Sequence, residues 1–198
     1  MDQLSNQTDL RVIKTQEAIK TAFLQLISKK GFVAITINDI AQQARINRST
    51  FYLHYTDKYA LLNQLTTNGI ARVATTITPE LHIADNGVNY TAFTQDLNQS
   101  LSVVAGDPVL YTFILNDPAH LGLRQRAEDA LKAYLNQHLP QNTQMARDLL
   151  LEIVPSIYLA AIRWWLAHDM KYSPQFLAQE LAKFFELGSR SIIDSDSH

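Results

Sequence analysis

The side chains with the clearest chemistry in this sequence gather in one short stretch. It carries cationic and hydroxyl-bearing residues at close spacing: Arg48, Ser49, Thr50, Tyr52, His54 and Lys58. A guanidinium can donate two parallel hydrogen bonds to guanine O6 and N7, and a small hydroxyl side chain can approach a base edge. Phenol, imidazole and ammonium groups can donate to phosphate oxygens, which fixes register without reading sequence. These residue types indicate binding to double-stranded DNA.

Two short helices with a tight corner would position these side chains. Thr36 is expected to cap the first helix, with Asp39 three positions later as in a capping box. Apolar residues then recur at helical spacing, at Ile37, Ile40, Ala41 and Ala44. The corner is predicted at residues 45–47.

Asn47 is predicted to cap the second helix, which we expect to end near Tyr55. A helix this short is not stable alone, so one side must pack against neighbours. That side is assigned to Phe51, Leu53 and Tyr55, which leaves the polar side chains, His54 included, facing outward. Phe32, Val33 and Ile35 are expected in the same small core.

This segment resembles the DNA-binding domain of the TetR/AcrR family of bacterial transcription regulators. The resemblance rests on Thr36, Asp39-Ile40-Ala41, Ala44, Ile46-Asn47, Arg48, Thr50-Phe51-Tyr52, His54-Tyr55 and Lys58. Ser49 departs from the family, in which glycine is frequent there; serine allows close backbone approach less freely. The resemblance implies a DNA-binding set of Thr36, Asn47, Arg48, Ser49, Thr50, Tyr52, His54 and Lys58. The alternative is a helical hairpin with a solvated polar face.

The composition excludes several classes of protein. The 198 residues include no cysteine, so a disulfide framework and a cysteine nucleophile are excluded. Six histidines are scattered without metal-ligand spacing, and no phosphate-binding glycine loop or nucleophile elbow is present. We therefore expect no enzyme, no catalytic residues, no metal and no cofactor. Without a signal peptide or an apolar run of about 18 residues, the expected location is the cytoplasm, with no membrane partner.

Charge is distributed unevenly along the chain. Residues 1–60 carry eight Lys and Arg against five Asp and Glu, whereas the remainder carries nine against fourteen. A basic N-terminal part on an acidic body suits a DNA-binding head.

The chain is predicted to be all-α, with about nine helices and two domains. Residues 9–56 form the expected helix-turn-helix domain, and residues 57–198 form a helical regulatory and dimerisation domain. The first helix is expected to begin near Asp9 and to end before Gly31, and Thr56 is expected to cap the fourth. Further helices are predicted at 90–106, from 108, at 119–139, at 143–168 with a bend at Pro155, and from 174 to 187.

The last two helices are the expected homodimer interface. The segment from Glu152 to Met170 is apolar on more than one face, so it needs cover on every side. The family resemblance implies pairing of these helices between subunits, and a dimer with two recognition helices suits a palindromic operator. The alternative is that both helices form the core of a monomer.

A ligand pocket is expected in the body. Its candidate residues are Tyr111, Phe113, His120, Tyr158 and Trp164, and for each of them the alternative is an ordinary core position. Trp164 and Trp165 must point in different directions on a helix. Residues 162–174 are loosely similar to a firmicute-type branch of the family, some members of which are activators that respond to a protein. The expected function is a homodimeric repressor released by a small molecule; the alternative is a protein-responsive activator or adaptor without a pocket.

Overall fold

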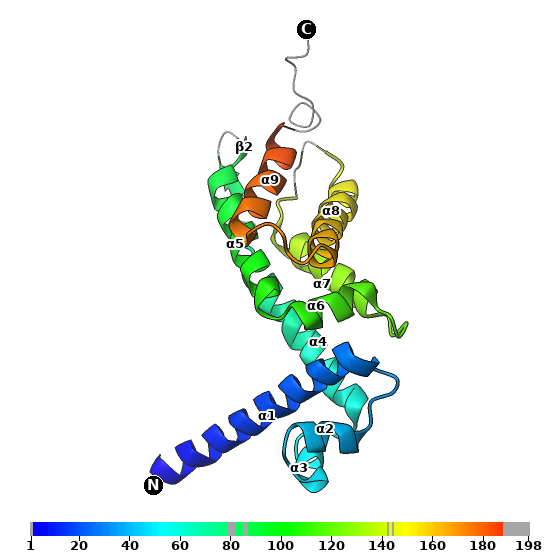
Figure 1. Cartoon of the computed structure of the whole chain (residues 1–198). Helices are drawn as coiled ribbons and strands as arrows, with labels where there is room; N and C mark the ends of the chain where they lie inside the picture. Colours follow the sequence, from blue (N-terminus) through cyan, green and yellow to red (C-terminus); the bar gives the residue numbers. More distant parts are fainter. Residues whose placement is uncertain (1, 79–81, 85–86, 142, 144, 188–198) are drawn as a thin grey trace. The chain divides into compact units, whose positions relative to one another are not determined.

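The computed structural model describes residues 2–78, 82–84, 87–141, 143 and 145–187, and within them the fold is all-α, as predicted (Figure 1). The helices are α1 (Asp2–Lys30), α2 (Ile37–Gln43), α3 (Arg48–Tyr52), α4 (Lys58–Ala74), α5 (Tyr90–Gly106), α6 (Pro108–Asn116), α7 (Leu123–His138), α8 (Arg147–Ala167) and α9 (Pro174–Leu187). Two short strands, β1 (Ile83–Ala84) and β2 (Gly87–Val88), pair antiparallel. This pair was not expected from the sequence.

The chain divides into two compact units within helix α4. Unit 1 comprises Met1–Asn68 and unit 2 comprises Gly69–His198. Each unit has its own buried side chains and is described by itself below. The predicted boundary at residues 56 and 57 stays a prediction.

Unit 1 is built around the C-terminal half of α1. Ile19 and Phe23 are fully buried, and the Phe23 ring meets the Phe32 ring edge to face with centroids 6.1 Å apart. Gly31 ends α1 as predicted; its φ of 73° lies in the left-handed region that favours glycine. The predicted start at Asp9 is wrong, because α1 begins at Asp2. No proline or glycine interrupts residues 2–8, so the helix can extend through them.

Two of the predicted core residues of unit 1 are exposed instead. Val33 is 80% exposed and Leu53 is 81% exposed, while Phe32, Ile35 and Phe51 are buried. Val33 lies in the turn after Gly31, where Val33 and Ala34 face outward between the buried Phe32 and Ile35. Leu53 follows the last residue of α3 and points away from Phe51, since neighbouring residues in a helical turn face different directions.

Unit 2 is organised by two sets of packed helices. Figure 1 shows α5 and α9 side by side, and their contact is the most extensive between any two helices of the unit. Helices α6, α7 and α8 pack on one another. Tyr158 and Trp165 on α8 are buried, as are Leu101 on α5 and Leu110 on α6.

Side chains cap two of the helix starts of unit 2. Asn89 caps α5, and the Ser173 hydroxyl accepts from the Phe176 N–H at the start of α9. Helix α7 starts at Leu123 rather than near residue 119. The Asp117 carboxylate accepts from the backbone N–H groups of residues 121, 122 and 123, which satisfies these donors and delays the start. Helix α8 starts at Arg147 rather than 143.

Helix α4 also differs at its start. Asp57, not Thr56, supplies the cap, because its carboxylate accepts from the Ala60 N–H at 2.7 Å. A carboxylate at this position satisfies a free donor and complements the positive end of the helix dipole.

Candidate nucleic-acid interface

Helix α3 is held in place by aromatic side chains on one side. Phe51 is fully buried, and its ring centroid lies 5.6 Å from that of Tyr55. The helix ends at Tyr52, earlier than predicted, although the Tyr55 N–H still bonds the Phe51 carbonyl at 3.0 Å. Burial of two large rings fixes which side of α3 remains free.

The free side of α3 carries the polar residues singled out in the sequence. Arg48, Ser49 and Tyr52 are exposed, and Thr50 and His54 are half-buried. The Arg48 guanidinium donates to the Tyr52 hydroxyl at 3.0 Å and lies 5.4 Å from the centre of its ring. The two longest polar side chains of this surface are therefore held together before any partner binds.

Asn47 caps α3 through its backbone only. Its carbonyl accepts from the N–H groups of Thr50 and Phe51, but its side chain makes no capping hydrogen bond, contrary to prediction. The exposed amide of Asn47 thus remains available at the start of α3.

Thr36 forms the predicted capping box on α2. The Thr36 hydroxyl accepts from the Asp39 N–H at 3.2 Å and donates to the Asp39 carboxylate at 2.6 Å. The same carboxylate accepts from the Thr36 N–H and pairs with Lys30 at 2.6 Å. The Lys30 ammonium and the Thr36 donors hold the pKa of Asp39 well below its usual range. The Thr36 hydroxyl is therefore engaged within the domain.

Lys58 contacts the protein backbone rather than open solvent. Its Nζ donates to the carbonyl oxygens of Phe32, Val33 and Ile35 at 3.1, 2.9 and 2.8 Å. It also lies 4.8 Å from the centre of the Phe32 ring. An ammonium has three N–H donors, and all three are used here. Lys58 fixes the turn between α1 and α2, a role that the local sequence does not signal.

Two of the five candidate pocket residues line one small apolar cavity in unit 2. Tyr111 and Tyr158 contribute to its wall with Ile70, Val104 and Ile162, and its volume is about 40 Å³. Phe113 is buried elsewhere in the core. His120 is exposed in the turn before α7. Trp164 is 42% exposed and stacks on His168.

Both cavity tyrosines have polar partners. Tyr158 donates to the Ser100 hydroxyl at 2.8 Å, and Tyr111 donates to the Gly69 carbonyl at 3.0 Å. Burial raises the pKa of Tyr111 to about 12 and that of Tyr158 further still. Both phenols therefore stay neutral donors across the physiological pH range.

Trp164 and Trp165 point in different directions, as expected. Trp165 is fully buried, and its indole N–H donates to the Tyr172 carbonyl at 2.8 Å.

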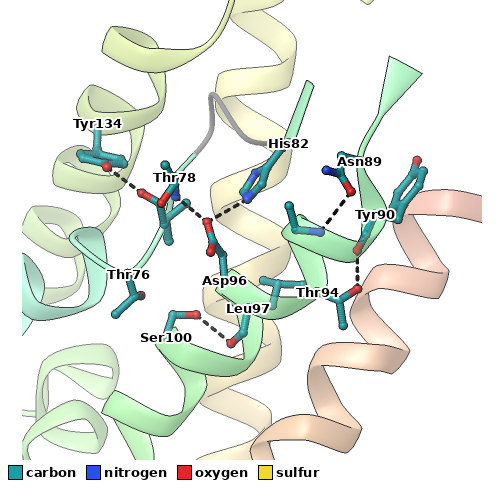
Figure 2. Close-up of polar contacts among 12 residues, drawn as sticks. Thr76, Thr78, His82, Asn89, Tyr90, Thr94, Asp96, Leu97, Ser100 and Tyr134 are labelled. Atoms are coloured by element: carbon teal, nitrogen blue, oxygen red, sulfur yellow. Dashed lines mark hydrogen bonds and ion pairs between the residues drawn. The ribbon is translucent and has the colours of Figure 1, made fainter. Parts of the chain in front are cut away.

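Polar side chains of unit 2 fasten the segment that follows α4 (Figure 2). The buried Asp96 carboxylate on α5 accepts from the Thr78 N–H at 2.5 Å and lies 3.0 Å from His82 Nε2. The Tyr134 hydroxyl on α7 donates to the Ile77 carbonyl at 2.6 Å. Sequence reasoning missed Asp96 and Tyr134, because their partners lie 18 and 57 residues away.

Within the described part of the chain, no group of three His, Asp or Glu side chains is placed to hold a metal ion.

Comparison with known proteins agrees with this geometry. The family model for bacterial regulatory proteins of the tetR family matches residues 19–65, which include α2, α3 and the start of α4. The HTH-type transcriptional regulator YxbF of Bacillus subtilis (strain 168), itself uncharacterized, is 26% identical over 190 residues. The match covers 94% of this chain but 48% of YxbF, so this chain spans about half the length of that relative.

Solved structures share the fold. The fatty acid degradation regulator FadR from Bacillus halodurans has a TM-score of 0.66 at 18% identity, over 89% of this chain and 96% of its own. FadR from Bacillus subtilis in complex with stearoyl-CoA has a TM-score of 0.62 at 18% identity, over 88% and 98%. The family match over residues 19–65 identifies the helix-turn-helix of unit 1 as a DNA-binding domain of the TetR family, and over most of its length the chain is similar to an HTH-type transcriptional regulator.

Proposed function

We propose that this chain is a homodimeric repressor that binds a palindromic operator through α3 and is released by a small-molecule effector bound in unit 2. The observation that carries the DNA part is the division of α3 into two sides. Phe51 and Tyr55 anchor the helix, and Arg48, Ser49 and Tyr52 face solvent.

The DNA contacts fall into two groups. Arg48 reads a guanine, and Ser49 and Thr50 approach base edges. Asn47, Tyr52 and His54 bind the flanking phosphates. The remaining two residues of the set implied by the sequence, Thr36 and Lys58, act indirectly: their polar groups are engaged within unit 1, and they hold α2 and the preceding turn in position.

The proposed dimer interface lies on α8 and α9. Exposed apolar side chains mark both helices: Leu149, Ile153, Trp164, Phe176 and Phe184. By length and composition α8 would suffice to cross a membrane, and most of its apolar stretch is not buried within the chain. The same surface of a second copy would cover these apolar side chains. The resulting dimer also supplies the two recognition helices that a palindromic operator requires. The protein is then cytoplasmic, without a membrane partner.

The effector must bind the DNA-competent and released states with different affinity, because a ligand with equal affinity for both does not change their populations. FadR from Bacillus subtilis, whose structure contains stearoyl-CoA, supports a small-molecule input for this fold. One observation favours the alternative, a protein-responsive activator or adaptor. The apolar cavity of about 40 Å³ has room for only a few water molecules, so a bulky apolar effector requires it to widen.

Selection of operators from random duplexes tests this proposal. The purified chain is incubated with the pool at several salt concentrations, and bound sequences are recovered and sequenced. Recovery of one palindromic site, together with a dimer mass in sedimentation equilibrium, is the expected result. Weak, salt-sensitive binding without a recovered motif would count against a sequence-specific repressor.

A further inference from the structure

The larger of the two cavities described in unit 2 lies between α7 and α8. Its volume is about 170 Å³, against about 40 Å³ for the apolar cavity. Its wall includes Leu115 at the end of α6, Arg124 and Glu128 on α7, and Ser156, Leu159 and Arg163 on α8. Arg124 and Glu128 are four residues apart on α7, and Ser156 and Arg163 are about two turns apart on α8, so each pair shares a helix face.

This cavity carries uncompensated positive charge. Among the described residues, neither Arg124 nor Arg163 has a hydrogen-bond or ion-pair partner. The carboxylate on the wall, Glu128, is already paired with Lys132 at 2.9 Å. A guanidinium has five N–H donors in a planar fork that matches a carboxylate or a phosphate. Both arginines are exposed and line this cavity from two packed helices, so each presents such a fork to an oxyanion that enters it.

The cavity also offers apolar surface. Leu115 and Leu159 line both this cavity and the apolar one, so they form a wall common to the two. An engineered apolar cavity of about 150 Å³ holds benzene. A ligand of about that size, with an anionic group at the arginines and its apolar part against the leucines, matches the space and the chemistry of the wall.

We propose that this cavity binds a small organic anion, a carboxylate or phosphate ester with a short apolar part, and that this anion is the effector of the regulator. The second half of the proposal rests on the function proposed above. Anion binding draws α7 and α8 together through Arg124 and Arg163. Helix α7 also carries Tyr134, which holds the Ile77 carbonyl just beyond the end of α4. A shift of α7 is thereby passed to the segment that follows α4.

Calorimetric titration of the full chain tests the site. The probes are benzoate, phenyl phosphate and the neutral analogue benzamide. We expect benzoate, phenyl phosphate or both to bind once per chain and benzamide not to bind; the relative affinity of the two anions distinguishes a carboxylate from a phosphate effector. Absence of binding by both anions, or equal binding of benzamide, overturns the proposal.

Matched variants locate the site. Arg124→Gln and Arg163→Gln keep a polar side chain but remove the charge, and each should weaken anion binding by about tenfold or more. Arg126→Gln removes the same charge from α7 at a position that lines neither cavity, and it should bind like the wild type. Circular dichroism checks that each variant is folded. Wild-type affinity in both cavity variants, or an equal loss in all three, rejects the site.

The effector role is tested on the selected operator. Saturating anion should change operator affinity by about fivefold or more in the wild type and not in Arg163→Gln. Anion binding without any change in operator affinity would leave the cavity without a regulatory role and overturn that half of the proposal. If no operator can be selected, the proposed repressor function is wrong. The proposed anion site is tested separately, by the calorimetric titration.

Discussion

The polar contacts inside unit 1 and those inside unit 2 differ in how far apart their partners lie along the sequence. Around the DNA-binding surface most polar contacts join residues three or four positions apart, such as Thr36 with Asp39 and Arg48 with Tyr52. Unit 2 has local polar contacts as well, but it adds contacts between distant residues: Tyr158 with Ser100 spans 58 positions, and Tyr90 with the Phe185 carbonyl spans 95. Local contacts make a surface whose shape depends on a short sequence, whereas the distant contacts of unit 2 require the assembled helices.

The largest expected effect tests the buried side of unit 2. Trp165→Ala removes a fully buried indole and its hydrogen bond to the Tyr172 carbonyl, and it should cost about 3–5 kcal/mol of stability. Trp164→Ala is the matched control, since its neighbouring indole is 42% exposed. Urea denaturation of both variants measures the difference. Equal losses would show that the two tryptophans are not buried differently in solution.

Lys58 is the exception in unit 1, because its contacts span 23 to 26 residues. Lys58→Met keeps the aliphatic stem but leaves three carbonyl oxygens without their donor, and it should cost about 1.5–3 kcal/mol of stability in urea denaturation. Operator affinity should fall, while the slope of log affinity plotted against log salt concentration stays unchanged. A slope smaller by about 0.9 would instead identify a phosphate contact.

Arg48→Ala tests the local contacts of the DNA-binding surface. It should weaken operator binding by about 1–3 kcal/mol and relax preference at one base pair. Tyr52→Phe is its partner variant: it removes the hydroxyl that holds Arg48, and it should weaken binding broadly without changing which base is preferred. Competition binding against single-base operator variants checks both. An unchanged base preference in Arg48→Ala argues against base reading by this residue.

The smallest effect concerns the capping box. Thr36→Ala should cost about 0.5–2 kcal/mol of stability by urea denaturation at neutral pH. The pKa of Asp39 is lowered on folding, so its contribution is present above the ordinary value of about 4 and is lost as pH falls below it. Asp39→Asn should therefore flatten the acid limb of stability against pH. An unaltered acid limb would show that the carboxylate does not contribute.

The difference in contact range also decides what the sequence could predict. The capping box, the end of α1 at Gly31 and the outward side of α3 follow from neighbours along the chain, and all three are found. The arginine-lined cavity is formed by residues of α6, α7 and α8, and nothing near Arg124 signals Arg163. Leu53 and Val33 were misplaced because hydrophobic character alone does not say which side of a turn faces the core.

The close packing around Gly69 restricts how this sequence can drift. A β-carbon at this position would lie 3.2 Å from Leu110 Cδ2, and Leu110 is itself buried. Even alanine therefore requires Leu110 to move by a few tenths of an ångström, in a core where neighbours leave little room. Among diverging relatives, position 69 on α4 is expected to change only together with position 110 on α6, so that the two helices evolve as a pair.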